Sequence, residues 1–146
     1  MAAFVLDTYA MVAFFRNEKG ADEIEKILLD TLRGQHELYL CSYNAGEIYY
    51  ALWKKDGKTN ADACRRKLFQ FPITIVEADL QLTFEAATIE ATHKLSYADA
   101  HAAGWTLHFD ATVLTGDKEF NNLKDIKGFK VKQIIWSAIT QIVRIL

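Results

Sequence analysis

The sequence is poor in cysteine and proline. It has 146 residues, two cysteines, Cys41 and Cys64, and one proline. Two cysteines without CxxC spacing are too few for a disulfide framework, so we expect reduced, mostly buried thiols in a cytoplasmic protein. The scattered glycines and single proline leave no obvious linker. We therefore predict one domain covering residues 1–146, a length that can bury one sizeable core.

Long hydrophobic runs are also missing. No stretch approaches the roughly 20 apolar residues of a membrane span, so we expect no membrane association. The apolar N-terminus, Met1–Phe15, contains Asp7 and lacks a basic region, which is not typical of a signal peptide. The most apolar stretch, Ile134–Leu146, is interrupted by Ser137, Gln141 and Arg144, and we interpret it as a final strand and a packed tail.

Several catalytic motifs are absent. There is no Gly-rich phosphate loop, no G-x-S-x-G turn and no HExxH pair, which disfavours nucleotide triphosphatases, serine hydrolases and histidine-centred zinc enzymes. Asp7-Thr8-Tyr9 lacks a second acid two residues on, which disfavours an aspartyl-phosphate phosphatase. Among the histidines only His101, two residues after Asp99, is a candidate for a role. The net charge of −2 argues against wholesale coating of nucleic acid but permits a local basic surface.

What the sequence does contain is an alternation of strand and helix patterns. β-branched or apolar runs predict strands at Phe4–Leu6, Leu38–Cys41, Ile73–Val76, Ala111–Thr115 and Lys130–Ile135. Helical spacing predicts helices at Tyr9–Phe15, Ala21–Arg33, Ser42–Lys55, Asn60–Phe69, Asp79–His93 and Ser96–Leu107, with Ser42 as an N-cap. This alternation predicts an α/β fold whose parallel sheet carries helices on both faces.

Four acids occupy the positions where such a sheet binds ligands. Asp7 and Asp117 each follow a predicted strand, Glu47 lies in the helix after another, and Asp99 begins a helix that leads into one. Ligands of open α/β sheets bind beyond the carboxyl ends of the strands, so the topology can bring all four acids to one rim. Oxygen-rich acidic sites suit Mg²⁺ or Mn²⁺, which promote phosphodiester hydrolysis.

Each acid also has a purely structural explanation. Asp7 can be a helix N-cap, Asp117 can close a glycine-assisted turn, and Asp99 can complete a capping box with Ser96. Glu47 can simply be exposed, although the neighbouring Gly46 should cost about 1 kcal/mol in a helix, which a close approach by backbone or ligand would explain. The four acids together carry more weight than any one of them.

These residues stand in blocks that resemble the PIN-domain nucleases, and most closely their VapC-type toxins. The blocks run from Phe4 to about Trp136 and read Val5-Leu6-Asp7-Thr8, Asn44-Ala45-Gly46-Glu47-Ile48-Tyr49-Tyr50-Ala51-Leu52, Leu95-Ser96-Tyr97-Ala98-Asp99-Ala100 and Ala111-Thr112-Val113-Leu114-Thr115-Gly116-Asp117-Lys118-Glu119-Phe120. The resemblance implies a three-layer α/β/α fold with a five-stranded parallel sheet in the order 3-2-1-4-5. It also implies a Mg²⁺- or Mn²⁺-dependent endoribonuclease that forms a homodimer and is inhibited by a partner antitoxin.

Roles for single residues follow from the same resemblance. Asp7 and Asp99 would be the main metal ligands, Glu47 would ligate the ion or orient the attacking water, and Asp117 would complete the site or hold a second ion. Thr8 and Thr115 would brace the acids or touch phosphate. The chain departs from the family pattern at Leu107–Asp110, where a small residue or glycine is commoner, and in the apolar tail Ser137–Leu146.

Some features have open readings. The aromatic residues of the Ser42–Lys55 helix, Tyr43, Tyr49, Tyr50 and Trp53, can stack bases, but Tyr49 and Trp53, four residues apart, suit packing in a core or dimer surface better. The lysines and arginines near 54–67 and 118–132 suit a solvated face better than a phosphate-binding one. Two other functions remain open, a non-catalytic PIN-like binding or assembly module and a housekeeping nuclease that processes RNA or DNA.

Overall fold

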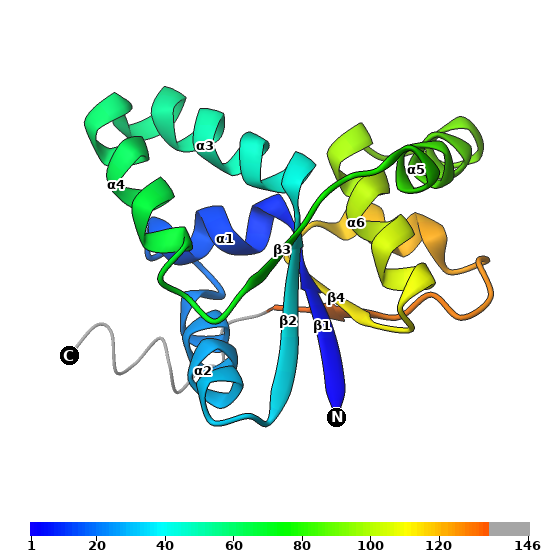
Figure 1. Ribbon diagram of the computed structural model, residues 1–146. Coiled ribbons are helices and arrows are strands. Elements are labelled where there is room, and N and C mark those ends of the chain that lie inside the picture. The colour runs from blue at the N-terminus through cyan, green and yellow to red at the C-terminus, as the bar shows by residue number, and fades with distance from the viewer. Residues whose placement is uncertain (135–146) are drawn as a thin grey trace.

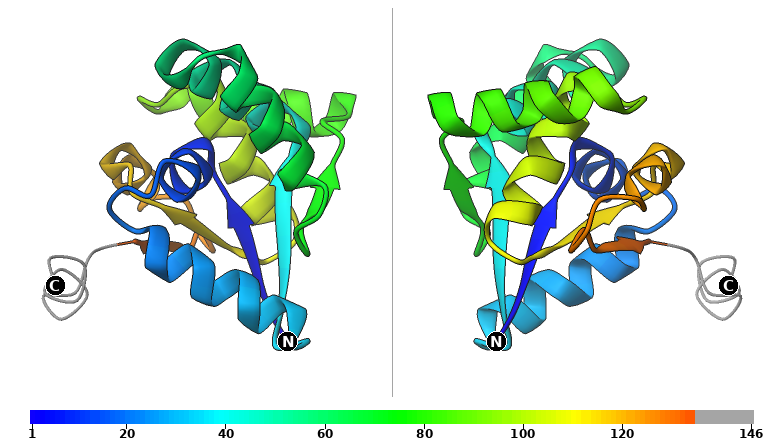
Figure 2. Two further views of the ribbon diagram at one scale, coloured as in Figure 1. Left: turned by 90° about the vertical axis from the view of Figure 1, so that its left-hand side faces the viewer. Right: turned by 90° about the vertical axis from the view of Figure 1, so that its right-hand side faces the viewer.

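The sheet has five parallel strands. In the computed structural model, which describes residues 1–134, the strand order is β3-β2-β1-β4-β5. The strands are β1 (Ala2–Leu6), β2 (His36–Cys41), β3 (Thr74–Val76), β4 (Thr112–Thr115) and β5 (Val131–Gln133). Figure 2 shows them fanned across the molecule, with β3 at one edge and β5 at the other. The predicted α/β class and strand order are confirmed.

Helices cover both faces of this sheet, which makes three layers (Figure 1). One face carries α1 (Thr8–Phe15), α2 (Ala21–Leu32), α3 (Ser42–Asp56) and α4 (Lys58–Leu68). The other carries α5 (Leu80–Thr92), α6 (Tyr97–His108) and the short 3₁₀ helix η1 (Lys118–Leu123). Since parallel strands are buried on both faces, they consist largely of apolar residues.

Successive side chains of each strand point to opposite faces of the sheet, which divides the core in two. Leu6 and Leu114 point into the layer of α1 to α4, whereas Val5 and Val113 point into the layer of α5 and α6. The first layer is built mostly from leucine, isoleucine and methionine. The second is rich in alanine, which lets α6 lie close to the sheet. All four strand residues are completely buried, so the centre of the sheet is fixed from both sides.

The expected elements are found, with some corrections. Ser42 is the first residue of α3 and not its N-cap, because its hydroxyl accepts a hydrogen bond from the Ala78 amide at 3.0 Å and so ties α3 to the end of β3. The 3₁₀ helix η1 was not predicted. Ile135 and the tail Ser137–Leu146 lie outside the described residues, so the predicted end of the last strand and the packed tail stay predictions.

Other sequence expectations have mixed outcomes. Cys41 and Cys64 are buried and free, as predicted. The unusual turn before β4 contains Asp110 at φ 49°, a left-handed conformation that usually favours glycine. Tyr49 and Trp53 pack against each other edge to face, 5.8 Å apart, beneath cations of α4 and not inside the core. Within residues 1–134 no helix is long and apolar enough to cross a membrane.

Candidate active site

The order in which strands are added to the sheet reverses between β1 and β4. From β1 it turns toward β2 and β3, and it then crosses back to β4 on the other side of β1. The two strands are neighbours, so the connections that leave their carboxyl ends diverge. Open α/β sheets bind ligands at such a switch point. Asp7 follows β1 directly, and Asp117 lies two residues beyond β4, so both predicted acids are at this point.

Asp7 is completely buried, and both of its carboxylate oxygens have a partner. Oδ1 accepts the Ala10 amide at 2.8 Å, which makes Asp7 the N-cap of α1, and Oδ2 accepts the Thr115 hydroxyl. The pKa of Asp7 is raised from 3.8 to about 8, chiefly by burial and also by the charges of Asp99 and Asp117, although the two hydrogen bonds oppose the increase. The capping role is therefore real, but it does not explain a carboxylate buried beside two others.

Asp99 lies in the first turn of α6 and is almost fully buried. Its amide donates to the Ser96 hydroxyl at 3.1 Å, so the expected serine cap is present. The pKa of Asp99 is raised to about 7, chiefly by burial and then by the charges of Asp117 and Glu47, although a hydrogen bond with Ser96 opposes the increase. Asp7 and Asp99 thus each respond to the negative charge of other predicted acids.

A third carboxylate beside Asp99 and Asp117 was missed by sequence reasoning. Oxygen atoms of Asp99, Asp117 and Glu119 lie within 4.8 Å of one another. Glu119 is brought there by η1, whose N-cap is Asp117 and whose second residue is Glu119, with the Asp117 carboxylate accepting the Glu119 amide at 2.9 Å. The signal in the sequence was a second acid, two residues after Asp117, close to the end of the same strand.

Glu47 comes from α3, on the opposite side of the sheet from α6. It is half-buried, and its charge acts on Asp99. The expected close approach at Gly46 is wrong for the described protein atoms, because a Cβ placed there meets nothing within 4 Å. Gly46 instead lines an apolar groove of about 280 Å³ with Phe15, Leu52, Leu68 and others.

Asn44 is a second residue that sequence reasoning missed. It is completely buried, and its Nδ2 donates to the Thr8 hydroxyl at 3.2 Å and to the Ala98 carbonyl at 3.1 Å. Thr8 follows Asp7 and Ala98 precedes Asp99, so this one side chain joins the starts of α1, α3 and α6. In the sequence it was visible only as a polar residue three positions before Glu47.

Thr115 connects the two acids that follow the strands. Its hydroxyl donates to Asp7 and accepts the Asp117 amide at 2.8 Å, so its proton is already used and it braces both residues. The Thr8 hydroxyl accepts a hydrogen bond from Asn44, and within residues 1–134 no acceptor is found for its own proton. Thr115 therefore links Asp7 to Asp117, whereas the Thr8 hydroxyl still has a proton to donate.

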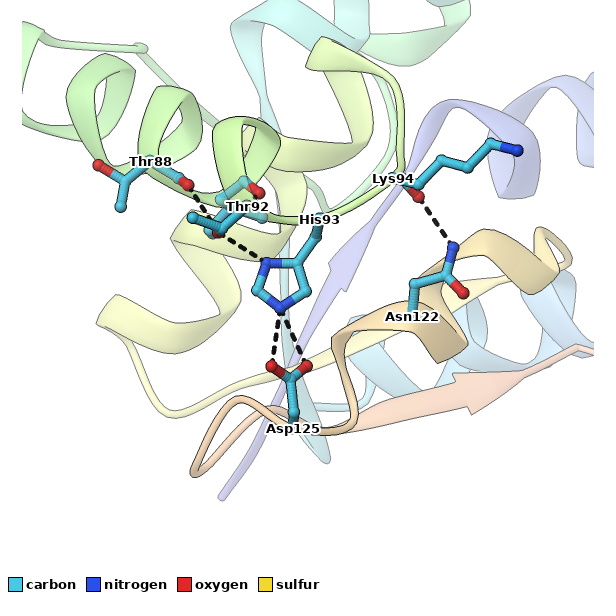
Figure 3. Close-up of polar contacts among 7 residues, drawn as sticks. Thr88, Thr92, His93, Lys94, Asn122 and Asp125 are labelled. Carbon is cyan, nitrogen blue, oxygen red and sulfur yellow. Dashed lines mark hydrogen bonds and ion pairs between the residues drawn. The ribbon is translucent and has the colours of Figure 1, made fainter.

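A cluster of polar contacts holds η1 against the connection between α5 and α6 (Figure 3). The His93 ring contacts the Asp125 carboxylate at 2.9 Å, and the Asn122 amide donates to the Lys94 carbonyl at 2.9 Å. The hydrogen bond from His93 lowers the pKa of Asp125. These contacts fix the segment that carries Asp117 and Glu119 relative to the start of α6, where Asp99 lies.

His101, the histidine singled out from the sequence, does not join the acids. It is buried; its Nδ1 contacts the Tyr97 carbonyl at 2.8 Å, and its ring stacks on Tyr43, 4.5 Å away and nearly parallel. On a helix, Tyr97 and His101 share a face and Asp99 points to the other side. The histidine is part of the packing between α3 and α6.

The donor set suits a hard divalent cation. Within residues 1–134 the one group found with ligand spacing is all carboxylate, with neither sulfur nor imidazole, which matches the oxygen preference of Mg²⁺ and Mn²⁺. Burial, and to a smaller extent the neighbouring negative charges, raise the pKa of Asp7 and Asp99, and a bound cation would favour their ionised forms. The residues present therefore fit such an ion.

Comparison with known proteins identifies the family. The PIN domain model matches residues 4–126. Among solved structures, the chain is similar to Mycobacterium tuberculosis VapC20, described as a toxin that cleaves the sarcin-ricin loop (TM-score 0.69, 14% identity, 83% of this chain and 95% of that one). It is also similar to a chain of the DNA-bound VapBC complex of Salmonella typhimurium (TM-score 0.68, 20% identity, 91% and 98%).

A third similar structure is PAE2754 from Pyrobaculum aerophilum, with a TM-score of 0.62 and 18% identity over 98% of this chain and 96% of that one. No curated protein matches the sequence. At these identities the solved structures support the fold, and the family model, which covers most of the chain, supports the membership. This chain belongs to the PIN domain family.

Proposed function

We propose that this protein is a divalent-metal-dependent endoribonuclease and the toxin of a VapBC-type toxin–antitoxin pair. The observation that supports it best is the convergence of buried carboxylates at the switch point between β1 and β4. Burying repelling acids destabilises a fold, and they are expected mainly where a cation or a reaction needs them. We also propose a single domain, a homodimer and a cytoplasmic location.

The acids take distinct roles in this proposal. Asp7, Asp99 and Asp117 would hold Mg²⁺ or Mn²⁺, with Glu119 as a further ligand beside the last two. The bound ion supplies Lewis acidity and neutralises charge on the phosphate. Glu47, which is half-buried on α3, would orient the attacking water in line with the leaving oxygen and accept its proton. The Thr8 hydroxyl would donate to a phosphate oxygen, and Thr115 would keep Asp7 in place.

The test compares two chemically identical substitutions. Asp7→Asn should abolish Mg²⁺- or Mn²⁺-dependent cleavage of RNA, because the amide keeps the cap on Ala10 but removes the negative charge. Asp79→Asn is the matched control, since Asp79 caps α5 in the same way, accepting the Leu82 amide at 2.9 Å, yet is not among the acids of the site. Equal cleavage by both variants would refute the assignment.

The antitoxin part of the proposal has its own test. Several of the structurally similar proteins are VapBC or other toxin–antitoxin complexes, which supports a protein partner for this chain. Expression of the chain alone should arrest growth, and co-expression of a short reading frame directly upstream should restore it. Cleavage in vitro without growth arrest, or without such a neighbour, would favour a housekeeping nuclease.

A further inference from the structure

Tyr9 is an exposed aromatic side chain at the edge of the acidic site. It is the second residue of α1, two positions after Asp7, and 44% of its surface is exposed. Its ring lies against the backbone of Gly116, the residue between Thr115 and Asp117. A Cβ added to Gly116 would lie 2.0 Å from the Tyr9 Cε1 atom, so only glycine permits this contact.

The Tyr9 ring packs against Gly116, yet much of its surface remains exposed to solvent. Gly116 contacts one edge of the ring, and within residues 1–134 no aromatic or cationic group is found over it and no hydrogen bond is found for its hydroxyl. An exposed aromatic ring that packs on the backbone beside a phosphodiester-cleaving site offers a surface on which a nucleobase can stack. Proteins bind unpaired RNA in this way, because stacking needs a base that is not covered by its neighbours.

Tyr43 has the same exposure, 44%, but a different environment. One face of its ring is already stacked on His101 and an edge meets Tyr97 at 5.6 Å. Those two residues lie on the side of α6 that faces away from Asp99. The two tyrosines are therefore a natural pair for comparison, one with a free ring at the acids and one whose ring is used in packing.

We infer that Tyr9 is the base-stacking residue of the site, and that the substrate presents an unpaired base next to the scissile phosphate. This inference rests on the proposed ribonuclease function and narrows it to single-stranded or loop RNA. Tyr9 acts on substrate position, while the acids carry out the hydrolysis.

The experiment tests whether the effect of removing the Tyr9 ring depends on the presence of the base that it is proposed to stack on. Cleavage of a single-stranded RNA is compared with that of the same RNA carrying one abasic nucleotide, moved stepwise along the cleavage site. For the wild type, loss of the stacked base should lower kcat/KM by about 5- to 150-fold. Tyr9→Ala should lower it by a similar factor on the intact RNA, with no further loss on the abasic RNA, and Tyr9→Phe should cleave like the wild type.

Two further variants complete the test. Tyr43→Ala is the matched control and should retain the sensitivity to the abasic nucleotide. Gly116→Ala should weaken cleavage when Tyr9 is present, because it displaces the ring, and should have no effect in a Tyr9→Ala background. Mn²⁺ affinity, measured by calorimetry, should be unchanged by Tyr9→Ala.

The outcomes separate this inference from the proposed function. If the wild type shows metal-dependent cleavage but Tyr9→Ala and the wild type respond alike to the abasic nucleotide, Tyr9 does not stack a base and the nuclease proposal stands. Equal losses in Tyr9→Ala and Tyr43→Ala would also overturn the inference. If the wild type cuts no RNA with Mg²⁺ or Mn²⁺, both proposals fail together.

Discussion

The carboxyl end of the sheet and its two faces are built in opposite ways. The faces bury leucine, isoleucine, valine and alanine without polar partners. The carboxyl end buries Asp7, Thr8, Asn44, Asp99 and Thr115 within a short distance of the switch point. Apolar burial stabilises the fold, whereas buried carboxylates that repel one another destabilise it. The two faces of the sheet therefore stabilise the fold, and the acids at its carboxyl end reduce that stability.

The largest expected difference between the two regions is in how pH affects stability. Without divalent ions, the acids at the carboxyl end should make the free energy of unfolding depend on pH, whereas the apolar faces should not. Asp7 and Asp99 have folded pKa values of about 8 and about 7, above the ordinary 3.8. The folded state therefore holds more protons than the unfolded one, and stability should fall as pH rises from about 4 to 8. Each group contributes up to about 1.4 kcal/mol per pH unit within its window.

Thermal unfolding in EDTA between pH 5 and pH 8 measures this effect. Asp7→Asn should flatten the profile and unfold at a higher temperature than the wild type at pH 8, and Mg²⁺ or Mn²⁺ should stabilise the wild type there. A flat wild-type profile would mean that burial does not raise the pKa of Asp7 and Asp99 in the folded protein.

A core substitution should affect stability and leave the site alone. Ile24→Ala on α2 removes a completely buried side chain from the layer of α1 to α4, and Ile24 is on an element that carries none of the acids of the site. We expect a loss of about 2–5 kcal/mol in the free energy of unfolding by denaturant. Activity per folded molecule should stay unchanged below the unfolding transition. A fall in that activity would show that the two regions are not independent.

Asn44→Ala should show the smallest loss of stability and affect both regions. The variant leaves the Ala98 carbonyl and the Thr8 hydroxyl without their buried donor, at a cost of about 1–3 kcal/mol. Because Asn44 joins the helices that carry the acids, kcat should fall as well.

Thr106→Val is the matched control for Asn44→Ala. Thr106 is equally buried but donates only within its own helix, to the Ala102 carbonyl at 2.7 Å. Its substitution should change stability without changing kcat. If both variants have the same kcat, Asn44 is a structural residue and does not position the acids.

Much of the fold followed from local patterns. The apolar runs that become β1, β2 and β4 end at polar residues, and their helical connections require a parallel sheet. Asp7 and Asp117 were found because the residue after a strand in such a sheet faces the ligand site. The cap expected at Ser42 failed because the Ala78 amide, 36 residues away, takes the serine hydroxyl. A local capping rule has no information about that partner.

The sequence by itself determined the class of the fold, the family and the candidate acids, because periodicity and motif spacing are local properties. Only the tertiary structure decided which groups meet: Glu119 beside Asp99, Asn44 between Thr8 and Ala98, and Tyr9 against Gly116. These contacts join segments that lie up to about a hundred residues apart. They depend on how layers pack on the sheet, which a linear pattern does not specify.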